Sequence, residues 1–478
     1  MQQRRFRYQG GCGSGKLHVE NKPKMFTMKK TPRVIAVEIL NRIEETGAFA
    51  EPLLDAFLSR FPANLHDRRL LTNVFYGTLR MRGHLDWIIG QLYRGNLMDM
   101  ETELKNILRV GLYQIMFTDR IPGFAIVDEA VKAAKRLHPA GSGLVNAILR
   151  NAIRKRKEIV YPAREEDPSL YISVVHSHPL WLVKRWMEMF GTDRTMALCA
   201  ANNEIPPLAL RVNRWKTTRD KVIEKMRHDG FDVRPTEFSP DGVILSNPAI
   251  PLREIPCYQT GWISVQDEAS QLIAHLVAPE AGMTILDVCA GVGRKTTHLA
   301  EIMGNQGSII ALDISSHKVE ALRDAAKKSG ITIVDTMVGD AAYDLRNAFR
   351  EKFDRVLVDA PCSGLGTLRR NPEIKWRISP EDIKNLASLQ KGLLKSAAPC
   401  VKKGGTLVYS TCTLIPEENE DVIEDFLVHH ECFRRMQPPD TISGRMIDDK
   451  GFFRTDPHHH GTDGFFAAIL EKRGERKN

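Results

Sequence analysis

Four apolar, strand-like segments at residues 284–288, 308–312, 333–338 and 355–358 are each followed by a glycine turn or a carboxylate. Helix-like segments separate them, and this alternation extends over residues 262–472. Such a pattern predicts a mostly parallel sheet with helices on both faces. Sheets of that kind bind ligands at the carboxyl ends of their strands. The pattern therefore predicts the fold of this region and also the edge that carries its site.

The first three strand ends suit a cofactor that contains adenosine. The glycine-bearing turn at residues 289–295 lets a backbone approach a ligand closely. Asp313 is placed to accept from both ribose hydroxyls, and Asp340 to accept from an adenine amino group. The turn alone leaves a dinucleotide, S-adenosylmethionine and simple tight packing open, but the three ends together favour S-adenosylmethionine. The expected cofactor residues are Cys289, Ala290, Gly291, Val292, Gly293, Arg294, Lys295, Asp313, Asp340 and Asp359.

Two cysteines, Cys362 and Cys412, follow strand-like segments in the phrases DAPC and YSTC. C5 of cytosine is a poor nucleophile, so methylation there needs a thiolate that first adds to C6 and a group that assists its later release. A single cysteine is more often a small buried hydrophobe. Two cysteines in these phrases favour the cytosine chemistry. The turn after residue 358 also lacks the Pro-Pro-aromatic sequence expected of enzymes that methylate exocyclic amines.

Residues 31–158 have helical periodicity and predict an all-helical domain. Thr31 can cap the first helix, Pro32 suits its first turn and Gly47 ends it. Periodicity alone favours a generic helical bundle. We expect residues 1–30 to be a disordered basic tail, residues 159–176 a linker, residues 177–260 a small α/β subdomain and residues 261–472 the catalytic domain. The small subdomain either positions RNA or acts as a structural spacer.

The net charge of +9 comes almost entirely from the first 35 residues, which hold nine Lys and Arg against one Glu. An RNA surface must therefore consist of local patches. No C-x-x-C pair indicates structural zinc, and three adjacent histidines at 458–460 cannot all face one ion, so we expect no metal. No apolar stretch is long enough to span a bilayer, and we expect a cytoplasmic protein. The candidate RNA contacts are Arg150, Arg154, Arg369, Arg370 and Lys375.

Several phrases of the helical region resemble the NusB-type RNA-binding domain. They are DRR at residues 67–69, YGTLR at 76–80, VDEAV at 127–131 and VNAILR at 145–150. Their order along the chain favours this family domain over a generic bundle. The resemblance implies that the N-terminal domain binds RNA.

The catalytic region resembles the RNA 5-methylcytosine methyltransferases of the NOL/NOP/Sun group. The resemblance rests on VQDEAS at residues 265–270, the glycine loop with Asp313 and Asp340, DAPCSG at 359–364, STC at 410–412 and DGFF at 463–466. With the NusB-type region in front, the chain resembles the RsmB (Sun/Fmu) branch. This implies a multidomain protein with a NusB-like all-α domain and a class I, Rossmann-like α/β methyltransferase domain. It also implies a 16S ribosomal RNA substrate, the usual target of the family being cytosine 967.

The same resemblance assigns roles at the strand ends. Cys412 is the expected nucleophile, Cys362 assists its release, and Asp359 hydrogen-bonds or protonates the ring at N3. In DNA cytosine methyltransferases the Pro-Cys cysteine attacks instead, so the order of the two cysteines follows from the resemblance alone. We expect a monomer that acts on free ribosomal RNA or an early assembly particle.

The glycine loop departs from the family sequence Cys-Ala-Ala-Pro-Gly-Gly-Lys-Thr at Gly291, Val292 and Arg294. If backbone amides hold the cofactor, binding is retained, although Arg294 can change its strength. Two other hypotheses stay open: an RNA-binding factor that has lost its cofactor site, and a methyltransferase for another RNA such as tRNA.

Overall fold

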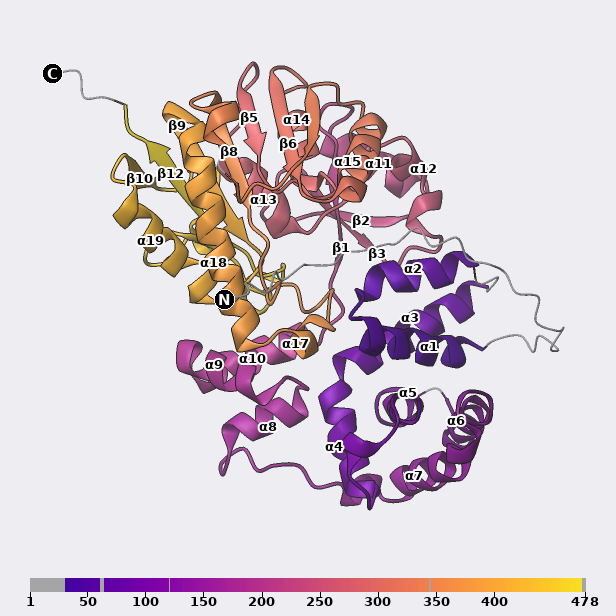
Figure 1. The fold of residues 1–478 in the computed structure, drawn as a ribbon. Helices are drawn as coiled ribbons and strands as arrows, with labels where there is room; N and C mark the ends of the chain where they lie inside the picture. Colours follow the sequence, from indigo (N-terminus) through magenta and orange to yellow (C-terminus); the bar gives the residue numbers. More distant parts are fainter. Residues whose placement is uncertain (1–30, 61–63, 120, 344, 475–478) are drawn as a thin grey trace, which may run out of the picture.

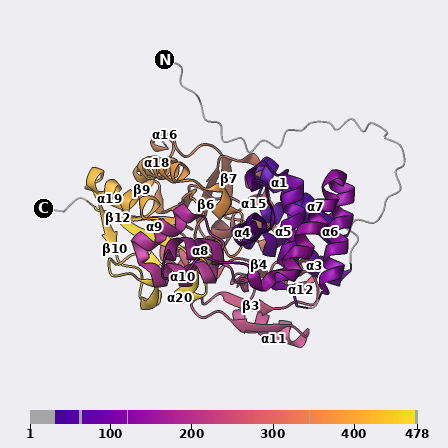
Figure 2. The same ribbon diagram turned by 90° about the horizontal axis from the view of Figure 1, so that it is seen from below.

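The computed structural model describes residues 31–60, 64–119, 121–343 and 345–474. Figures 1 and 2 show an N-terminal helical bundle to one side of two β-sheets. The tail that we predicted to be disordered lies outside the described residues, as does the glycine- and lysine-containing segment 10–16. None of the described helices has both the length and the apolar character needed to cross a membrane.

The N-terminal bundle is built around helix α5, which contacts α1, α3, α6 and α7 and is almost wholly buried. Helix α1 begins as predicted: the Thr31 side chain accepts a hydrogen bond from the Val34 amide, and Gly47 ends the helix with a φ of 64°. The predicted all-helical fold is confirmed. The helices are α1 (Pro32–Thr46), α2 (Ala50–Arg60), α3 (Leu65–Arg80), α4 (Arg82–Leu92), α5 (Thr102–Phe117), α6 (Gly123–Leu137) and α7 (Ser142–Arg154).

Three helices follow where we predicted a linker and the start of the small subdomain. The linker prediction for residues 159–176 is wrong in its second half, which forms α8 (Pro168–Val175). Asp167 caps this helix and Ile172 is buried against α9 (Leu180–Phe190) and α10 (Thr192–Asn202). The short helix shows little periodicity because one turn carries most of its buried surface. The same apolar cluster includes Leu365 and Leu414, so these helices support the loops that follow two strands of the large sheet.

The small sheet is antiparallel, with strand order β2-β3-β1-β4. The strands of this sheet and a helix are present in the region that we predicted to be a small α/β subdomain. We expected the subdomain to end at residue 260. Its fourth strand lies beyond that residue and pairs with β1 as a short edge strand. The elements are β1 (Leu208–Val212), α11 (Arg219–His228), β2 (Asp232–Pro235), β3 (Gly242–Ser246), α12 (Pro256–Gln259) and β4 (Ile263–Val265).

The large sheet has the order β10-β12-β9-β8-β5-β6-β7, with β5 to β9 parallel and β12 antiparallel to both β9 and β10. The predicted parallel core is confirmed. Its strands are β5 (Thr284–Asp287), β6 (Ser308–Asp313), β7 (Val334–Val338), β8 (Phe353–Asp359), β9 (Val401–Thr411), β10 (Phe433–Met436), β11 (Phe453–Arg454) and β12 (Phe466–Lys472).

Helices cover both faces of this sheet. Apolar residues of α13, α14 and α15 pack on one face, and those of α18 and α19 pack on the other. The strand order reverses between β5 and β8, so the carboxyl ends of these neighbours diverge into a crevice that suits a ligand. The helices are α13 (Glu268–Val277), α14 (Arg294–Ile302), α15 (Ser316–Ser329), α16 (Arg346–Phe349), α17 (Ile374–Arg377), α18 (Pro380–Ala397), α19 (Glu420–His429) and α20 (Pro457–His460).

Candidate active site

The predicted cofactor and catalytic residues lie at the carboxyl ends of five neighbouring strands, β5 to β9. Side chains and backbone from different strands touch there. The Gly291 amide donates to Asp313 Oδ2 at 2.9 Å, linking the ends of β5 and β6. Lys295 Nζ donates to Asp359 Oδ2 at 2.6 Å, linking the β5 loop to the end of β8. The edge predicted from the sequence is therefore one continuous site in space.

The glycine loop between β5 and α14 forms a tight turn. Gly291 and Gly293 have φ values of 57° and 81°, which favour glycine, and the Gly293 amide donates to the Ala290 carbonyl at 3.0 Å. A side chain on Gly293 would collide with Leu322, whose Cγ would lie 2.5 Å from the added Cβ. Above Gly291, by contrast, an added Cβ would meet no atom within 4 Å. The loop is thus packed on one side and open on the other, as a ligand cradle requires.

The residues around this open side fit S-adenosylmethionine. Asp313 is buried, and its two oxygens accept from the amides of Gly291 and Ser315, which fixes the carboxylate while leaving lone pairs for hydroxyl donors. Asp340 is exposed at the next strand end, where its Oδ1 accepts from the Ala342 amide. Ile314 is 68% exposed directly after Asp313. We did not predict Ile314; an apolar residue that follows a strand-end carboxylate was the available signal.

Arg294, the main departure in the loop, has an exposed side chain. The structure therefore gives no sign that Arg294 crowds the loop.

Asp287, at the end of β5, is buried and accepts a hydrogen bond from Thr296 Oγ1 at 2.7 Å. Burial raises the pKa of Asp287 to about 7. Burial also raises the pKa of the Cys289 thiol, which makes Cys289 a poor nucleophile compared with an exposed cysteine.

Cys362 and Cys412 face each other, with their sulfur atoms 3.3 Å apart. This exceeds the roughly 2.05 Å of a disulfide bond, and both cysteines are free thiols. The Cys412 amide also lies 3.3 Å from Cys362 Sγ. The hydrogen bond with Cys412 is the largest cause that raises the pKa of the Cys362 thiol well above its ordinary value, and burial is the second.

Asp359 lies beside the two cysteines at the end of β8. Its Oδ1 accepts from Ser410 Oγ at 2.8 Å, and its Oδ2 accepts from Lys295. The ammonium of Lys295 also lies 5.2 Å from the centre of the Phe465 ring. Each carboxylate oxygen therefore has a fixed partner, and the orientation of Asp359 is determined before any substrate arrives.

A buried carboxylate, Glu418, connects the two cysteine loops, and we did not predict it. Its Oε1 accepts from the Ser363 amide at 2.8 Å and its Oε2 from Ser363 Oγ at 2.5 Å, while Ser363 Oγ also lies 2.8 Å from Thr413 Oγ1. Gln390 Nε2 donates to the same Oε1 at 3.0 Å. Ser363 follows Cys362 and Thr413 follows Cys412, so this network fixes both loops relative to each other.

Three of the five predicted RNA contacts are bonded to partners inside the protein: Arg369 and Lys375 are buried, so their prediction is wrong, whereas the Arg370 side chain is 25% exposed. Arg369 is 5% exposed, and its guanidinium donates to the Gly461 carbonyl and pairs with Glu204. Arg370 pairs with Asp267 at 2.8 Å and with Asp463 at 2.9 Å. These charges follow the Pro-Cys loop in the sequence, but they join segments of the protein to each other instead of facing RNA phosphates.

Lys375, the third, is 1% exposed between the N-terminal bundle and the catalytic domain. Its Nζ donates to the Arg80 carbonyl at 2.9 Å and to Asn203 Oδ1 at 3.3 Å. Burial lowers the pKa of Lys375 to about 7. By contrast, Arg150 and Arg154 are exposed on α7, where each donates a hydrogen bond to an asparagine of its own helix, at 2.9 Å and 2.6 Å. They stay candidates for RNA contact.

Lys375 should make stability depend on pH. Between pH 7 and about 10 the unfolded chain holds a proton that native Lys375 has lost, so the free energy of unfolding should rise with pH, by at most about 1.4 kcal/mol per pH unit. Lys375→Met should remove this part of the rise. Urea unfolding from pH 7 to pH 9.5 measures it, with Lys384→Met on the exposed face of α18 as control. Equal slopes for wild type and Lys375→Met would contradict the prediction.

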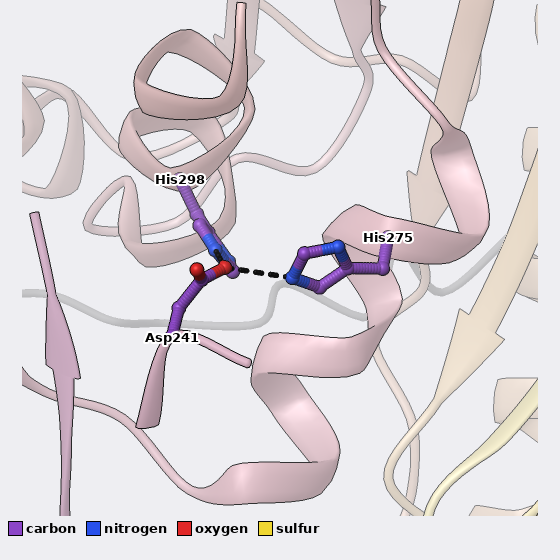
Figure 3. A group of neighbouring side chains, drawn as sticks. All are labelled: Asp241, His275 and His298. Carbon is purple, nitrogen blue, oxygen red and sulfur yellow. Dashed lines mark hydrogen bonds and ion pairs between the residues drawn. The ribbon is translucent and has the colours of Figure 1, made fainter. Parts of the chain in front are cut away.

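One side-chain group in the described residues has the composition of a metal site. Asp241, His275 and His298 bring their ligand atoms within 4.8 Å of one another. Figure 3 shows the three side chains, which we did not predict as a group because they come from the β2–β3 turn, α13 and α14. Both imidazole Nε2 atoms lie at hydrogen-bond distance from Asp241 Oδ2, at 2.7 Å and 3.0 Å.

The surroundings of this group favour hydrogen bonds over a metal ion. Metal-bound histidines normally donate their other ring N–H to an acceptor. His298 Nδ1 is buried without a partner, so a metal at Nε2 would leave an unsatisfied donor. Arg214 also pairs with Asp241 Oδ1 at 3.2 Å, and its positive charge opposes a cation. The expectation that the reaction needs no metal stays a prediction.

Three family descriptions match the chain in succession. "NusB family" matches residues 30–154, "Methyltr_RsmF/B-like, ferredoxin-like domain" matches residues 178–251, and "16S rRNA methyltransferase RsmB/F" matches residues 274–471. These ranges coincide with the helical bundle, with α9 to β3, and with most of the region of the large sheet.

Named relatives span nearly the whole chain. The chain is 36% identical to the probable ribosomal RNA small subunit methyltransferase B of Bacillus subtilis, over 94% of this chain and 100% of the relative. It is 34% identical to ribosomal RNA small subunit methyltransferase B of Photorhabdus laumondii, over 92% and 98%. A crystal structure named PH0851 superimposes with a TM-score of 0.80 at 30% identity, covering 93% of this chain and 99% of that one. A methyltransferase homologue from Pyrococcus horikoshii gives a TM-score of 0.56 at 26% identity, covering 64% and 99%.

Proposed function

Since this chain belongs to the ribosomal RNA small subunit methyltransferase B family, which uses S-adenosylmethionine, we propose that it methylates C5 of a cytosine in 16S ribosomal RNA. The observation that carries this proposal is the pair of facing thiols, Cys362 and Cys412, beside Asp359 and the cofactor loop. Methylation of an exocyclic amine or a hydroxyl needs no thiol. Two of them at the mouth of the crevice match the addition and release that C5 chemistry requires.

Cys412 is the attacking residue in this proposal. Its thiol faces Cys362 at 3.3 Å, and the raised pKa of Cys362 disfavours Cys362 as the attacking thiolate. The Cys412 thiolate forms a bond to C6 of the cytosine, and the electron pair of the C5–C6 bond shifts toward N3. Asp359 faces N3, with its carboxyl group oriented by Lys295 and Ser410; it gives a proton to N3 as the thiolate adds and takes that proton back when the thiolate leaves.

The cofactor, when bound, supplies a methyl group from its sulfonium to the electron-rich C5. Cys412 is then bonded to carbon and carries no charge, which removes the main cause of the raised pKa of Cys362. Cys362 loses its proton to solvent, and as a thiolate it takes the proton from C5. The C6–S bond breaks with its electrons returning to Cys412. The net change replaces one proton of C5 by a methyl group.

The glycine loop, Asp313 and Asp340 would hold the cofactor, and the N-terminal bundle would hold the RNA. Exposed Arg150 and Arg154 on α7 support an RNA-facing surface there. We propose cytosine 967, the usual target of the family, as the methylated base. We also propose that the protein acts in the cytoplasm as a monomer, on free 16S RNA or an early assembly particle.

The test is methylation of small-subunit RNA prepared without modifications. With labelled S-adenosylmethionine, we expect one 5-methylcytosine per RNA, mapped by nuclease digestion and mass spectrometry. Transfer RNA serves as the matched control and should stay unlabelled. Label on an exocyclic nitrogen, or preferential label on the transfer RNA, would contradict the proposal. Tight RNA binding without any transfer would instead indicate a non-catalytic RNA-binding factor.

A further inference from the structure

Arg211 on β1 lies at the boundary between the small sheet and the catalytic domain, and it is 1% exposed. Its guanidinium lies 2.8 Å and 3.1 Å from the two oxygens of Glu301 and 3.0 Å from Thr297 Oγ1. It also donates to the Arg294 carbonyl and to Gln266 Oε1. All three guanidinium nitrogens therefore donate hydrogen bonds. Three of the four partner residues belong to helix α14.

Two of these partners, Arg294 and Thr297, lie in the first turn of α14, which directly follows the glycine loop, and Glu301 lies in its last turn. Thr297 Oγ1 also donates to the Gly293 carbonyl at 2.8 Å, so Arg211 is one hydrogen bond away from the loop itself. The same turn carries Lys295, which orients Asp359. A shift of this turn would therefore move the cofactor loop and the Lys295 ammonium together.

A second buried contact holds the next turn of the same helix to the small subdomain. His298 Nε2 on α14 lies 3.0 Å from Asp241 Oδ2, and Figure 3 shows the two side chains next to each other. Asp241 lies at the start of β3, in the subdomain that carries Arg211. The helix is therefore held at two successive turns by a part of the chain that contributes no predicted cofactor residue.

We propose that Arg211 is a positioning residue for the S-adenosylmethionine site, through which the small subdomain sets the affinity for the cofactor. The inference rests on the proposed cofactor role of the loop at residues 289–295, and it is independent of the cysteine chemistry. Arginine is required because its planar fork reaches a carbonyl, a hydroxyl and a carboxylate at once, whereas a lysine ammonium has a single centre. The bonds of Arg211 therefore hold the backbone at the start of α14 in one orientation.

The variant design must separate positioning from folding. Arg211→Met alone would leave Glu301 as a buried carboxylate without its counter-ion, which destabilises a fold by itself. The double variant Arg211→Met with Glu301→Leu removes both charges and keeps apolar volume. Arg211→Lys keeps the charge for Glu301 but cannot also hold the Arg294 carbonyl.

Calorimetric titration with S-adenosylmethionine is the measurement, together with thermal unfolding and the split between kcat and KM. We expect the double variant to bind the cofactor about tenfold more weakly while it unfolds near the wild-type temperature. KM for the cofactor should rise with kcat little changed, and Arg211→Lys should lie between the two. Wild-type affinity in a folded double variant would overturn the proposal.

Lys216→Met is the matched control. The Lys216 ammonium donates to the carbonyls of Thr260 and Lys328 at 2.8 Å and 2.7 Å, which joins the same subdomain to the end of α15, and its substitution should leave cofactor affinity unchanged. Equal losses in Lys216→Met and the double variant would show a general loosening of the subdomain and would contradict a specific role for Arg211. Cys412→Ala should bind the cofactor normally, so a failure of the cysteine mechanism is distinguishable from a failure of this inference.

Discussion

Cys412→Ala should lower methyl transfer by at least about a thousandfold, because it removes the thiolate that is proposed to attack C6. Cys362→Ala should behave differently. It leaves the nucleophile but removes the group that takes the C5 proton, so the bond between Cys412 and C6 should form and then fail to break. A covalent protein–RNA species that survives denaturing gel electrophoresis is the expected result.

The two variants together test the assignment of roles. The double variant should give neither product nor covalent species, since the trap needs the attacking thiolate. Cys289→Ser is a control at the same edge of the sheet and should give no covalent species, because Cys362 is still present to release Cys412. A covalent species in Cys412→Ala, and none in Cys362→Ala, would reverse the roles of the two cysteines.

Glu418→Ala should cost about 3 kcal/mol of stability and at least about a hundredfold in kcat. The carboxylate is fully buried, and burial raises its pKa. Its removal leaves the Ser363 amide, the Ser363 hydroxyl and the Gln390 amide without their acceptor. Because Ser363 follows Cys362 and its hydroxyl bonds to that of Thr413, which follows Cys412, loosening this network should separate the two sulfurs.

Urea unfolding and single-turnover methylation measure the two effects of Glu418→Ala. Glu418→Gln keeps the shape and one acceptor oxygen, so it should lose less stability than Glu418→Ala. The neighbouring Glu417 pairs with Arg185 near the surface, and Glu417→Ala should change stability by less than about 1 kcal/mol. Similar losses for Glu417→Ala and Glu418→Ala would show that position in the loop, and not the buried acceptor, accounts for the effect.

Local patterns in the sequence predicted the architecture well. Strand ends are visible because an apolar run stops at glycine or a carboxylate, and the parallel order then places these ends at one edge whatever the exact packing. That is why Asp313, Asp340, Asp359, Cys362 and Cys412 were predicted as neighbours and lie at one edge of the sheet. Their chemical roles stay predictions until the variants above are measured.

Long-range pairing of charges was beyond the reach of these patterns. A run such as Arg369, Arg370 and Lys375 looks the same in sequence whether it faces RNA or an internal carboxylate. Its partners, Glu204, Asp267, Asp463 and the Arg80 carbonyl, are between 93 and 295 residues away along the chain. Helix α8 was not predicted for a related reason. Only the structure shows which of its apolar residues pack against α9 and α10.

The sequence by itself determined the three-part organisation, the parallel sheet and the residues at its carboxyl edge, because hydrophobic period and turn chemistry act over a few residues. Only the tertiary structure decided which buried charges support that edge: Glu418 beneath the cysteines, Arg211 beneath the cofactor loop and Lys375 between the domains. A charge can be buried only where folding brings a partner within a few ångströms, and that distance is not encoded in any short stretch of the chain.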